Sequence, residues 1–318
     1  GHNLRTWTIH FGKDYTHELE FAGELARQLK TDHEDFHIQP KTFIPDMHKI
    51  IWHLDEPIGD PITVPNFQLA KHASNEVDFI FNGEGGDPLF GGPKNFPLMM
   101  NDWYNLKRQE NYREQAYLAS YKRAYDELDM LLLPHVREEI NDARHLESHF
   151  TPYFIAETPY MLNKLMAINI QCKGAQLILP KVERMLGANG ITPLAPLFDK
   201  RLIDFSFKIH PKQKLAMGTE KIILKEAFKG KIPQSIIDRP KSGMRVPVHF
   251  WFQKEMKKFA KKILAPKQIE KAGIFNPYRI KELMSYDTPQ WQTRYGLKLW
   301  MILTFEIWRR VTLEGEKI

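Results

Sequence analysis

The chain of 318 residues has a single cysteine, Cys172, and no apolar run long enough to cross a membrane. One thiol cannot close an internal disulfide, and low cysteine usage is typical of a reducing compartment such as the cytoplasm. No basic segment followed by an apolar one opens the chain, so the sequence predicts neither an export signal nor a membrane partner. A soluble, cytoplasmic protein is expected, and a chain of this length can bury a core without disulfides.

Two further absences narrow the class of enzyme. There is no Gly-x-Ser-x-Gly motif, so a serine hydrolase built on that elbow is unsupported. The histidines at positions 33, 37, 48 and 53 have no cysteine partners and are too loosely spaced for zinc, so a zinc site is not predicted.

The net charge of +6 comes largely from basic residues between Lys200 and Lys271. Within that range, residues 254–264 place apolar side chains on one helical stripe and lysines on the opposite one. This pattern is typical of a solvated helix face, so no nucleic-acid partner is predicted. A positive field also suits an anionic nucleotide and its pyrophosphate.

The order of hydrophobic patterns divides the chain into two parts. Residues 1–96 read as a partial nucleotide-binding α/β core, with strands and helices expected at 4–11, 18–29, 35–38, 43–54, 65–74 and 77–81. Residues 97–318 read as helical, with the clearest amphipathic segments at 109–126, 156–186, 219–228, 246–265 and 289–311. The predicted fold class is α/β, an incomplete doubly wound parallel sheet followed by an all-helical C-terminal half.

Residues 77–92 join a predicted strand to a loop that carries five glycines and two carboxylates, Glu84 and Asp87. The apolar run at 77–81 is expected to be covered on both faces, as in a parallel sheet flanked by helices. Glycines let the backbone approach a ligand closely, and ligands of open α/β sheets bind beyond the carboxyl ends of the strands. The residues alone leave open a nucleotide site or a glycine-rich turn with two solvated acids.

The flanking residues favour the nucleotide site. The loop Asn82-Gly-Glu-Gly-Gly-Asp-Pro-Leu-Phe-Gly-Gly92 resembles the Ser-Gly-Glu/Asp-Gly-x-Asp-Glu-x-Phe-Gly-Gly loop of the asparagine synthetase family. Thr6-Trp-Thr-Ile-His-Phe11 resembles the family's adenine-binding strand, and Lys181-Val-Glu-Arg-Met185 and Ala195-Pro-Leu-Phe-Asp199 resemble two later blocks. The resemblance covers essentially the whole chain and implies the synthetase domain, with a PP-loop ATP pyrophosphatase-like, HUP-like fold.

The resemblance implies a ligase that uses ATP and Mg²⁺ to adenylate a carboxylate such as aspartate. Ammonia derived from glutamine would then amidate the acid, releasing AMP and pyrophosphate. The matching positions assign magnesium to Asp87, and orientation and deprotonation of the amine to Glu84, as a catalytic residue. ATP contacts are implied for Ile9, Asn82, Gly83 and Glu84.

A second group of candidates follows position 218. Thr219 is a predicted N-cap, which puts Lys221 in a first helical turn, where a lysine is unfavourable unless an anion lies nearby. A surface lysine and an anion site both remain open on the residues alone; the resemblance makes Lys221 a catalytic contact to the phosphates. Arg239 and Lys241, in a block like the family's Arg-x-Lys-x-Gly-Phe, either line the ATP site or only order their loop.

The chain lacks the Ser-Gly-Gly-x-Asp-Ser loop through which the family holds ATP. Loss of the strand that carries this loop is expected to expose apolar surface and unpaired backbone. We therefore expect a fragment or half of a split protein, inactive alone and completed by an N-terminal segment or a partner chain with the loop. The glutaminase domain is also absent, and Cys172, within a helical pattern, is expected in the core. A homodimer is left open.

The acid substrate is less well defined by the resemblance. Thr192 and Leu194 stand where the family has glutamate and arginine, which removes two charged groups near the substrate. This favours, as an alternative, a β-lactam-synthetase-like or other amide ligase acting on a different acid. A non-catalytic scaffold relative is a third hypothesis, which predicts no ATP-dependent release of pyrophosphate.

Overall fold

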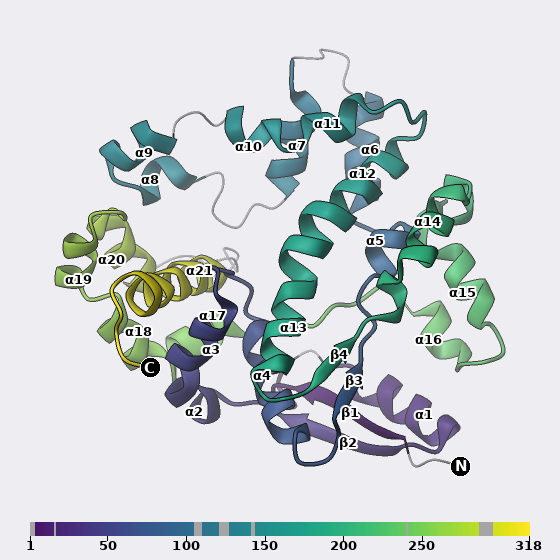
Figure 1. Ribbon diagram of the computed structural model, residues 1–318, viewed down its shortest axis with the longest axis horizontal. Helices are drawn as coiled ribbons and strands as arrows, with labels where there is room; N and C mark the ends of the chain where they lie inside the picture. Colours follow the sequence, from purple (N-terminus) through teal and green to yellow (C-terminus); the bar gives the residue numbers. More distant parts are fainter. Residues whose placement is uncertain are drawn as a thin grey trace. The chain divides into compact units, whose positions relative to one another are not determined.

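The computed structural model describes residues 4–15, 17–104, 110–120, 127–140, 144–239, 241–285 and 295–318 (Figure 1). The chain forms two compact units, each assembled from separate stretches. Unit 1 comprises residues 1–46, 61–93 and 174–247, and unit 2 comprises residues 47–60, 94–173 and 248–318. These units are defined by compactness, so the predicted division at residue 96 stays a prediction.

The first sheet of unit 1 has the predicted strand–helix–strand order. Strand β1 (Arg5–His10) pairs in parallel with β2 (Asp32–His37), and α1 (Leu19–Leu29) connects them. The helix ends at Lys30, whose left-handed conformation (φ 53°) lets its N–H donate to a carbonyl of the last turn. Strand β2 begins three residues earlier than predicted, because the polar stretch from Asp32 pairs with β1 although it carries no apolar alternation.

The second sheet of unit 1 joins segments that are far apart in the sequence. Strand β3 (Phe79–Phe81) pairs in parallel with β4 (Thr192–Leu194). Helices α4 (Thr63–Ala73) and α13 (Leu179–Gly187) precede these strands and pack on each other. Their core consists of Ala70, Ala73, Val182, Leu186 and Ile191, with Trp7, Val77 and Ile80 packed against it.

Two sequence predictions about strands were wrong. The chain beyond residue 96 is not all-helical, because it supplies β4 and a hairpin of β5 (Leu215–Ala216) and β6 (Thr219–Glu220). Strand β3 is not covered on both faces within the described residues: Phe79 is 52% and Phe81 60% exposed. Strand β4 gave no signal because it is only three residues long and contains Pro193, and β3 supplies its pairing partner. The described fold is therefore mixed α/β, with short parallel sheets.

The remaining helices of unit 1 are short. They are α2 (Pro40–Phe43), α5 (Gly86–Phe90), α14 (Lys200–Lys208), α15 (Ile222–Phe228) and α16 (Gln234–Asp238). Asp199 caps α14, since its carboxylate accepts a hydrogen bond from the Arg201 N–H at 2.8 Å. Hydrogen bonds from the Arg201 side chain and backbone lower the pKa of Asp199 to about 2. This cap matters for the site, because both α14 and α15 contact α5.

A buried lysine lies between α14 and the hairpin. Lys214 is fully buried, and its Nζ donates to the Ser206 carbonyl at 2.9 Å. Burial lowers the pKa of this ammonium group from 10.5 to about 8. The unfolded chain therefore binds this proton more tightly than the folded chain, so the lysine opposes folding below pH 8 and no longer does so above pH 10.5.

We expect this lysine to make stability depend on pH. Relative to a Lys214→Met variant, the wild type should gain roughly 2–3 kcal/mol of unfolding free energy between pH 7.5 and pH 10.5. Urea denaturation of both proteins across this pH range measures the difference between their unfolding free energies. The contributions of the other titrating groups are the same in both proteins and cancel in this difference. A difference that stays constant with pH would contradict the shifted pKa.

The described elements of unit 2 are helices, apart from an isolated antiparallel bridge between Leu132 and Phe275. Its central helix α21 (Tyr295–Trp308) packs against α3 (Met47–Leu54) and α17 (Val248–Gln253). The other helices are α6 (Asn95–Tyr104), α7 (Tyr112–Ser120), α8 (Leu128–Leu131), α9 (Pro134–Ile140), α10 (Arg144–Ser148), α11 (Thr151–Ile155), α12 (Met161–Ile168), α18 (Lys257–Ile263), α19 (Pro266–Ala272) and α20 (Pro277–Ser285). Residues 109, 121–126 and 289–294 of two predicted helices lie outside the described residues.

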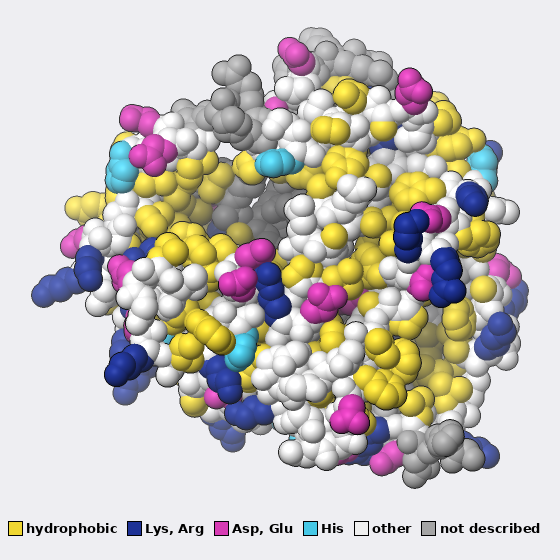
Figure 2. Space-filling model, in the orientation of Figure 1, with side chains coloured by type: hydrophobic (Ala, Val, Ile, Leu, Met, Phe, Trp, Pro, Cys, Tyr) yellow, Lys and Arg dark blue, Asp and Glu magenta, His cyan; other side chains and the backbone are white. Residues whose placement is uncertain are grey.

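The predicted packing of the lysine-rich segment is confirmed, whereas Cys172, expected in the core, is only half-buried. Around α18, Met256, Ala260 and Ile263 are buried while the lysines of the helix are exposed. On the face drawn in Figure 2, basic side chains are scattered among acidic and apolar ones. Cys172 lies in a π-helical segment (Asn169–Ile178) after α12, where it is half-buried and packs against a hydrophobic cluster. Among the described residues, no helix is both long and apolar enough to span a bilayer.

Candidate functional site

The loop that follows β3 begins as a continuation of the sheet. The Asn82 N–H donates to the Leu194 carbonyl of β4 at 2.8 Å. The Asn82 side-chain oxygen then accepts a hydrogen bond from the Glu84 N–H at 3.1 Å. Glu84 is half-buried and is held at the carboxyl end of β3, where the sequence predicted a ligand crevice.

Two glycines of this loop are required by close approach. Gly85 has φ +106°, and a Cβ on it would lie 3.0 Å from the Leu197 backbone carbon. A Cβ on Gly92 would lie 2.7 Å from the Cβ of Asp87. Larger residues at these positions would displace Leu197 or Asp87, so the glycines fix where the Asp87 carboxylate sits.

Asp87 lies in the first turn of α5 and meets two lysines from later in the chain. Lys221 Nζ lies 2.9 Å from Asp87 Oδ1, and Lys241 Nζ lies 3.8 Å from Asp87 Oδ2. Residues separated by 134 and 154 positions are thus brought to one carboxylate. In such a group the carboxylate can bind a cation, and the two ammonium groups can bind phosphate oxygens.

The position of Lys221 differs from the prediction. Thr219 is not an N-cap but part of strand β6, and α15 begins only at Ile222. Lys221 itself occupies the N-cap position in the left-handed region, with φ 55°. A lysine in this conformation is strained, and such strain is concentrated at functional sites. The tight β5–β6 hairpin, whose two turn residues also have positive φ, sets the approach of Lys221 to Asp87.

Two further predicted site residues, Arg239 and Ile9, make contacts outside the group formed by Asp87, Lys221 and Lys241. Arg239 lies 3.1 Å from Glu18 Oε1, and its guanidinium stacks 4.9 Å from the Phe21 ring centre. Arg239 thereby anchors the segment that carries Lys241 to α1. Ile9 lies on β1, where it pairs with Phe36. The nucleotide contacts assigned to both residues stay predictions.

A pocket adjoins Lys221 and Lys241. It has a volume of about 480 Å³ and lies between Gly83 and Gly86 of the loop, helix α15, residues 232–239 and Lys241. Sequence reasoning did not identify its apolar wall. The available signal was the apolar side of α15, where Leu224 is half-buried and Phe228 is 44% exposed instead of lying in a core.

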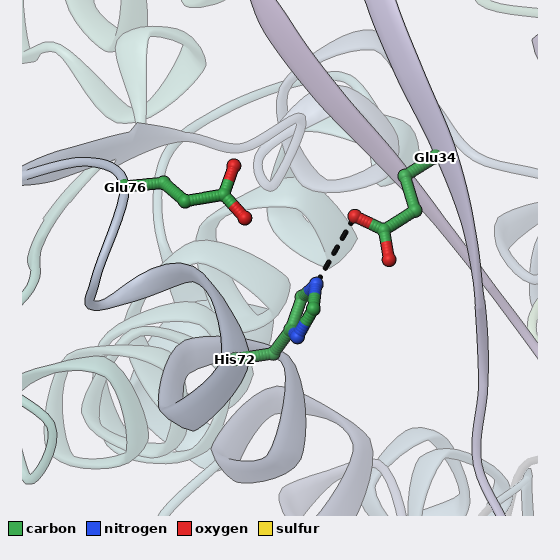
Figure 3. A group of neighbouring side chains, drawn as sticks. All are labelled: Glu34, His72 and Glu76. Carbon is green, nitrogen blue, oxygen red and sulfur yellow. Dashed lines mark hydrogen bonds and ion pairs between the residues drawn. The ribbon is translucent and has the colours of Figure 1, made fainter.

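A second group of polar side chains lies elsewhere in unit 1. Glu34 on β2, His72 on α4 and Glu76 after α4 point toward one another (Figure 3). One carboxylate oxygen or imidazole nitrogen from each residue lies within 4.8 Å of those of the other two. His72 Nε2 is 3.0 Å from Glu34 Oε2, and this contact lowers the pKa of Glu34. The Arg5 guanidinium lies 2.7 Å from Glu34 and 2.6 Å from Glu76. Because Arg5 already supplies the positive charge, we interpret the group as a salt-bridge network that joins β1, β2 and α4.

The sequence of the chain is similar to those of known proteins. The model of the asparagine synthase family matches residues 1–310. A Bacillus subtilis (strain 168) protein, asparagine synthetase (glutamine-hydrolyzing) 1, is 27% identical over 352 residues, covering 98% of this chain and 53% of that protein. A putative asparagine synthetase (glutamine-hydrolyzing) of Mycobacterium tuberculosis (strain H37Rv) is 23% identical and covers 98% and 52% of the two chains.

A third relative matches less of the chain. Asparagine synthetase B (glutamine-hydrolyzing) of Escherichia coli (strain K12) is 22% identical over 269 residues, covering 82% of this chain and 38% of that protein. The chain spans about half the length of the first two relatives.

Proposed function

The chain belongs to the asparagine synthase family, and on this premise we propose that it forms the synthetase part of an ATP-dependent amide ligase. The reaction joins a carboxylic acid, such as aspartate, to ammonia derived from glutamine. One observation carries the proposal: Asp87, Lys221 and Lys241 converge on one point beside a pocket, with contacts of 2.9 and 3.8 Å. A PP-loop-like nucleotide fold is proposed with it, supported by the parallel pairing of β3 with β4.

The first chemical step activates the acid. A carboxylate is a poor electrophile, so one of its oxygens forms a bond to the α-phosphorus of ATP while the bond to pyrophosphate breaks. Negative charge grows on the phosphoryl oxygens, and the Lys221 ammonium group, held at the left-handed N-cap of α15, stabilises it. Lys241 and Arg239 supply further positive charge along the same wall of the pocket.

The second step forms the amide. The nitrogen of ammonia forms a bond to the carboxyl carbon, the bond to AMP breaks, and the amine loses a proton. Glu84 is the proposed acceptor of that proton, because its backbone is fixed by Asn82 at the end of β3. Asn82 and Gly83 offer backbone groups to the nucleotide at the same strand end.

Magnesium fits the residues that are present. Mg²⁺ keeps several waters and is usually bound by one or two carboxylates together with substrate phosphates. Asp87 offers one carboxylate, and the two lysines beside it suit phosphate oxygens bound to the same ion. When bound, the ion offsets negative charge on the leaving pyrophosphate.

The proposal includes a further polypeptide segment, in the same protein or a partner, that carries a Ser-Gly-Gly-x-Asp-Ser loop. The exposed side chains of Phe79 and Phe81 on the two-stranded β3–β4 sheet support it, because parallel strands are usually covered on both faces. A strand and helix from that segment would cover these rings. Cytoplasmic location and a homodimer remain part of the proposal as well.

The ligase proposal is tested with the full-length protein, ATP, Mg²⁺ and a panel of acids. We expect release of pyrophosphate and AMP in equal amounts, only when an acid is present, and an amide product when ammonia is added. Formation of ADP in place of AMP would contradict the adenylation chemistry. Absence of nucleotide turnover with every acid would favour the non-catalytic scaffold.

A further inference from the structure

The pocket beside the Asp87 group has a size and a lining that bear on the substrate. Its volume of about 480 Å³ is within the range of small-molecule sites. Most of its side-chain wall is aliphatic or aromatic, and comes from the 3-10 helix η4 (Pro196–Phe198), α15, the turn after it and α16. The apolar lining residues are Leu197, Leu224, Phe228, Ile232, Ile236 and Ile237.

This apolar wall is open to water. Phe228 is 44% exposed, while Leu224, Ile232 and Ile236 are half-buried. Covering such surface with an apolar ligand group is favourable by roughly 25 cal/mol for each Å² removed from water. A ligand without an apolar group would leave this contribution unused.

The charged side chains of the pocket favour an anion. Four cationic residues line it, of which Lys221 and Lys241 both contact Asp87. Lys225 pairs with Glu220 at 3.3 Å, and Arg239 pairs with Glu18 at 3.1 Å. The four cationic side chains thus face three carboxylates, those of Asp87, Glu220 and Glu18, because Lys221 and Lys241 share Asp87. The sum of these charges is +1. The shared carboxylate places that charge at the end of the pocket nearest Asp87.

We propose that this pocket receives the organic part of the acid substrate, and that the substrate class is monocarboxylic acids with an apolar body. The inference rests on the proposed ligase function and narrows it. The carboxylate lies at the Lys221–Lys241 end, where it meets the α-phosphate. The apolar body lies against Leu224, Phe228 and the isoleucines.

Aspartate fits this pocket poorly. Its ammonium group needs an acidic partner and its second carboxylate needs donors, since burying unpaired charges is costly. Glu220 is the one acidic residue among the lining residues, and it already pairs with Lys225. The neighbouring strand β4 carries Thr192 and Leu194, so it adds no charged side chain at these two positions.

The test measures binding to the full-length protein by isothermal titration calorimetry. The probes are octanoate, the uncharged octanamide, and aspartate. We expect octanoate to bind at least about tenfold more tightly than either of the others, because it alone has both an apolar body and a single negative charge. Equal or tighter binding of aspartate would overturn the proposal.

Matched variants locate the binding. Phe228→Ala and Leu224→Ser should each weaken octanoate binding by about 5- to 10-fold. The control is Phe205→Ala, because Phe205 is 53% exposed, similar to Phe228, but does not line the pocket. This variant should bind octanoate as tightly as the wild type does. Lys241→Gln should weaken octanoate and leave octanamide unchanged. Octanoate binding that none of the pocket variants weakens would overturn the proposal, because octanoate would then bind elsewhere. The same result is expected if a polypeptide segment fills the pocket.

Pyrophosphate release with the same acids separates this inference from the ligase proposal. Release with aspartate, combined with no octanoate binding, would overturn the pocket assignment and leave the ligase standing. Octanoate binding that depends on Phe228, combined with no release for any acid, would keep the pocket assignment and remove the ligase. Octanoate-dependent release supports both.

Discussion

Replacing Lys221 with alanine is expected to lower acid-dependent pyrophosphate release by about 10²- to 10³-fold, the usual effect of removing one charge-stabilising donor. The Lys221 side chain is 16% exposed and lies 2.9 Å from Asp87, so its ammonium group is held before the substrate arrives. The loss should appear mainly in kcat, since the stabilised charge develops in the transition state. Steady-state kinetics of the full-length protein measures it.

The matched control for this variant is Lys229→Ala at the end of the same helix. The Lys229 side chain is 62% exposed, and its Nζ lies 3.8 Å from Glu226 Oε2. We expect its kinetics to match those of the wild type. Alanine at position 221 also keeps the left-handed strain that lysine already bears, so both variants should fold with similar stability. A Lys221→Ala enzyme with wild-type kcat would remove this residue from the mechanism.

Replacing Glu306 with glutamine is expected to destabilise the protein by about 3–5 kcal/mol, because it removes the carboxylate that pairs with the buried Arg310 and leaves Arg309 with Glu314 alone. Glu306 is fully buried in α21, where it accepts hydrogen bonds from Arg309 at 2.9 Å and from Arg310 at 2.9 Å. In the wild type, hydrogen bonds to this carboxylate raise the pKa of Arg309. An arginine keeps its proton even without such a partner, so the variant cannot avoid the cost of the buried charge by deprotonation. Urea denaturation followed by circular dichroism measures the loss.

The control variant is Glu226→Gln, which removes the carboxylate of an ion pair on the surface instead of a buried one. Its partner Lys229 is 62% exposed, and such exposed pairs contribute about 0–1 kcal/mol. A Glu306→Gln protein that is no less stable than Glu226→Gln would contradict the view that the buried cluster stabilises unit 2.

Several local features followed from the residues themselves. Strand β1 and helix α1 were predictable, because apolar positions with a period of two and then of 3.6 determine which backbone form buries them. Strand β2 was predicted only over its second half, since its first residues are polar. The lysine-rich helix around Met256 was predictable for the same reason. For the loop after β3, the residues left open a nucleotide site or a glycine-rich turn with two solvated acids, so the ligand contact there stays a prediction.

Other features depended on contacts between distant segments. Strand β4 has no pattern of its own, and Thr192 and Leu194 are extended because β3 supplies hydrogen-bond partners. The left-handed conformation of Lys221 depends on a hairpin that displaced the expected N-cap at Thr219. Local propensity could not predict strand β4, because its pairing partner β3 lies more than 100 residues away. It could not predict the conformation of Lys221 either, because that conformation follows a turn whose residues have positive φ.

The resemblance to the family therefore singled out Glu84, Asp87 and Lys221 as candidates, a choice that the residue types alone left open, and their roles stay predictions. The tertiary structure decided their grouping, because it brings Lys221 and Lys241 to Asp87 and leaves Arg239 on Glu18. It also decided which apolar side chains line a pocket and which fill a core, as for Phe228 on α15. The physical reason is that an amphipathic pattern specifies that a face will be apolar, but only long-range packing specifies what covers it.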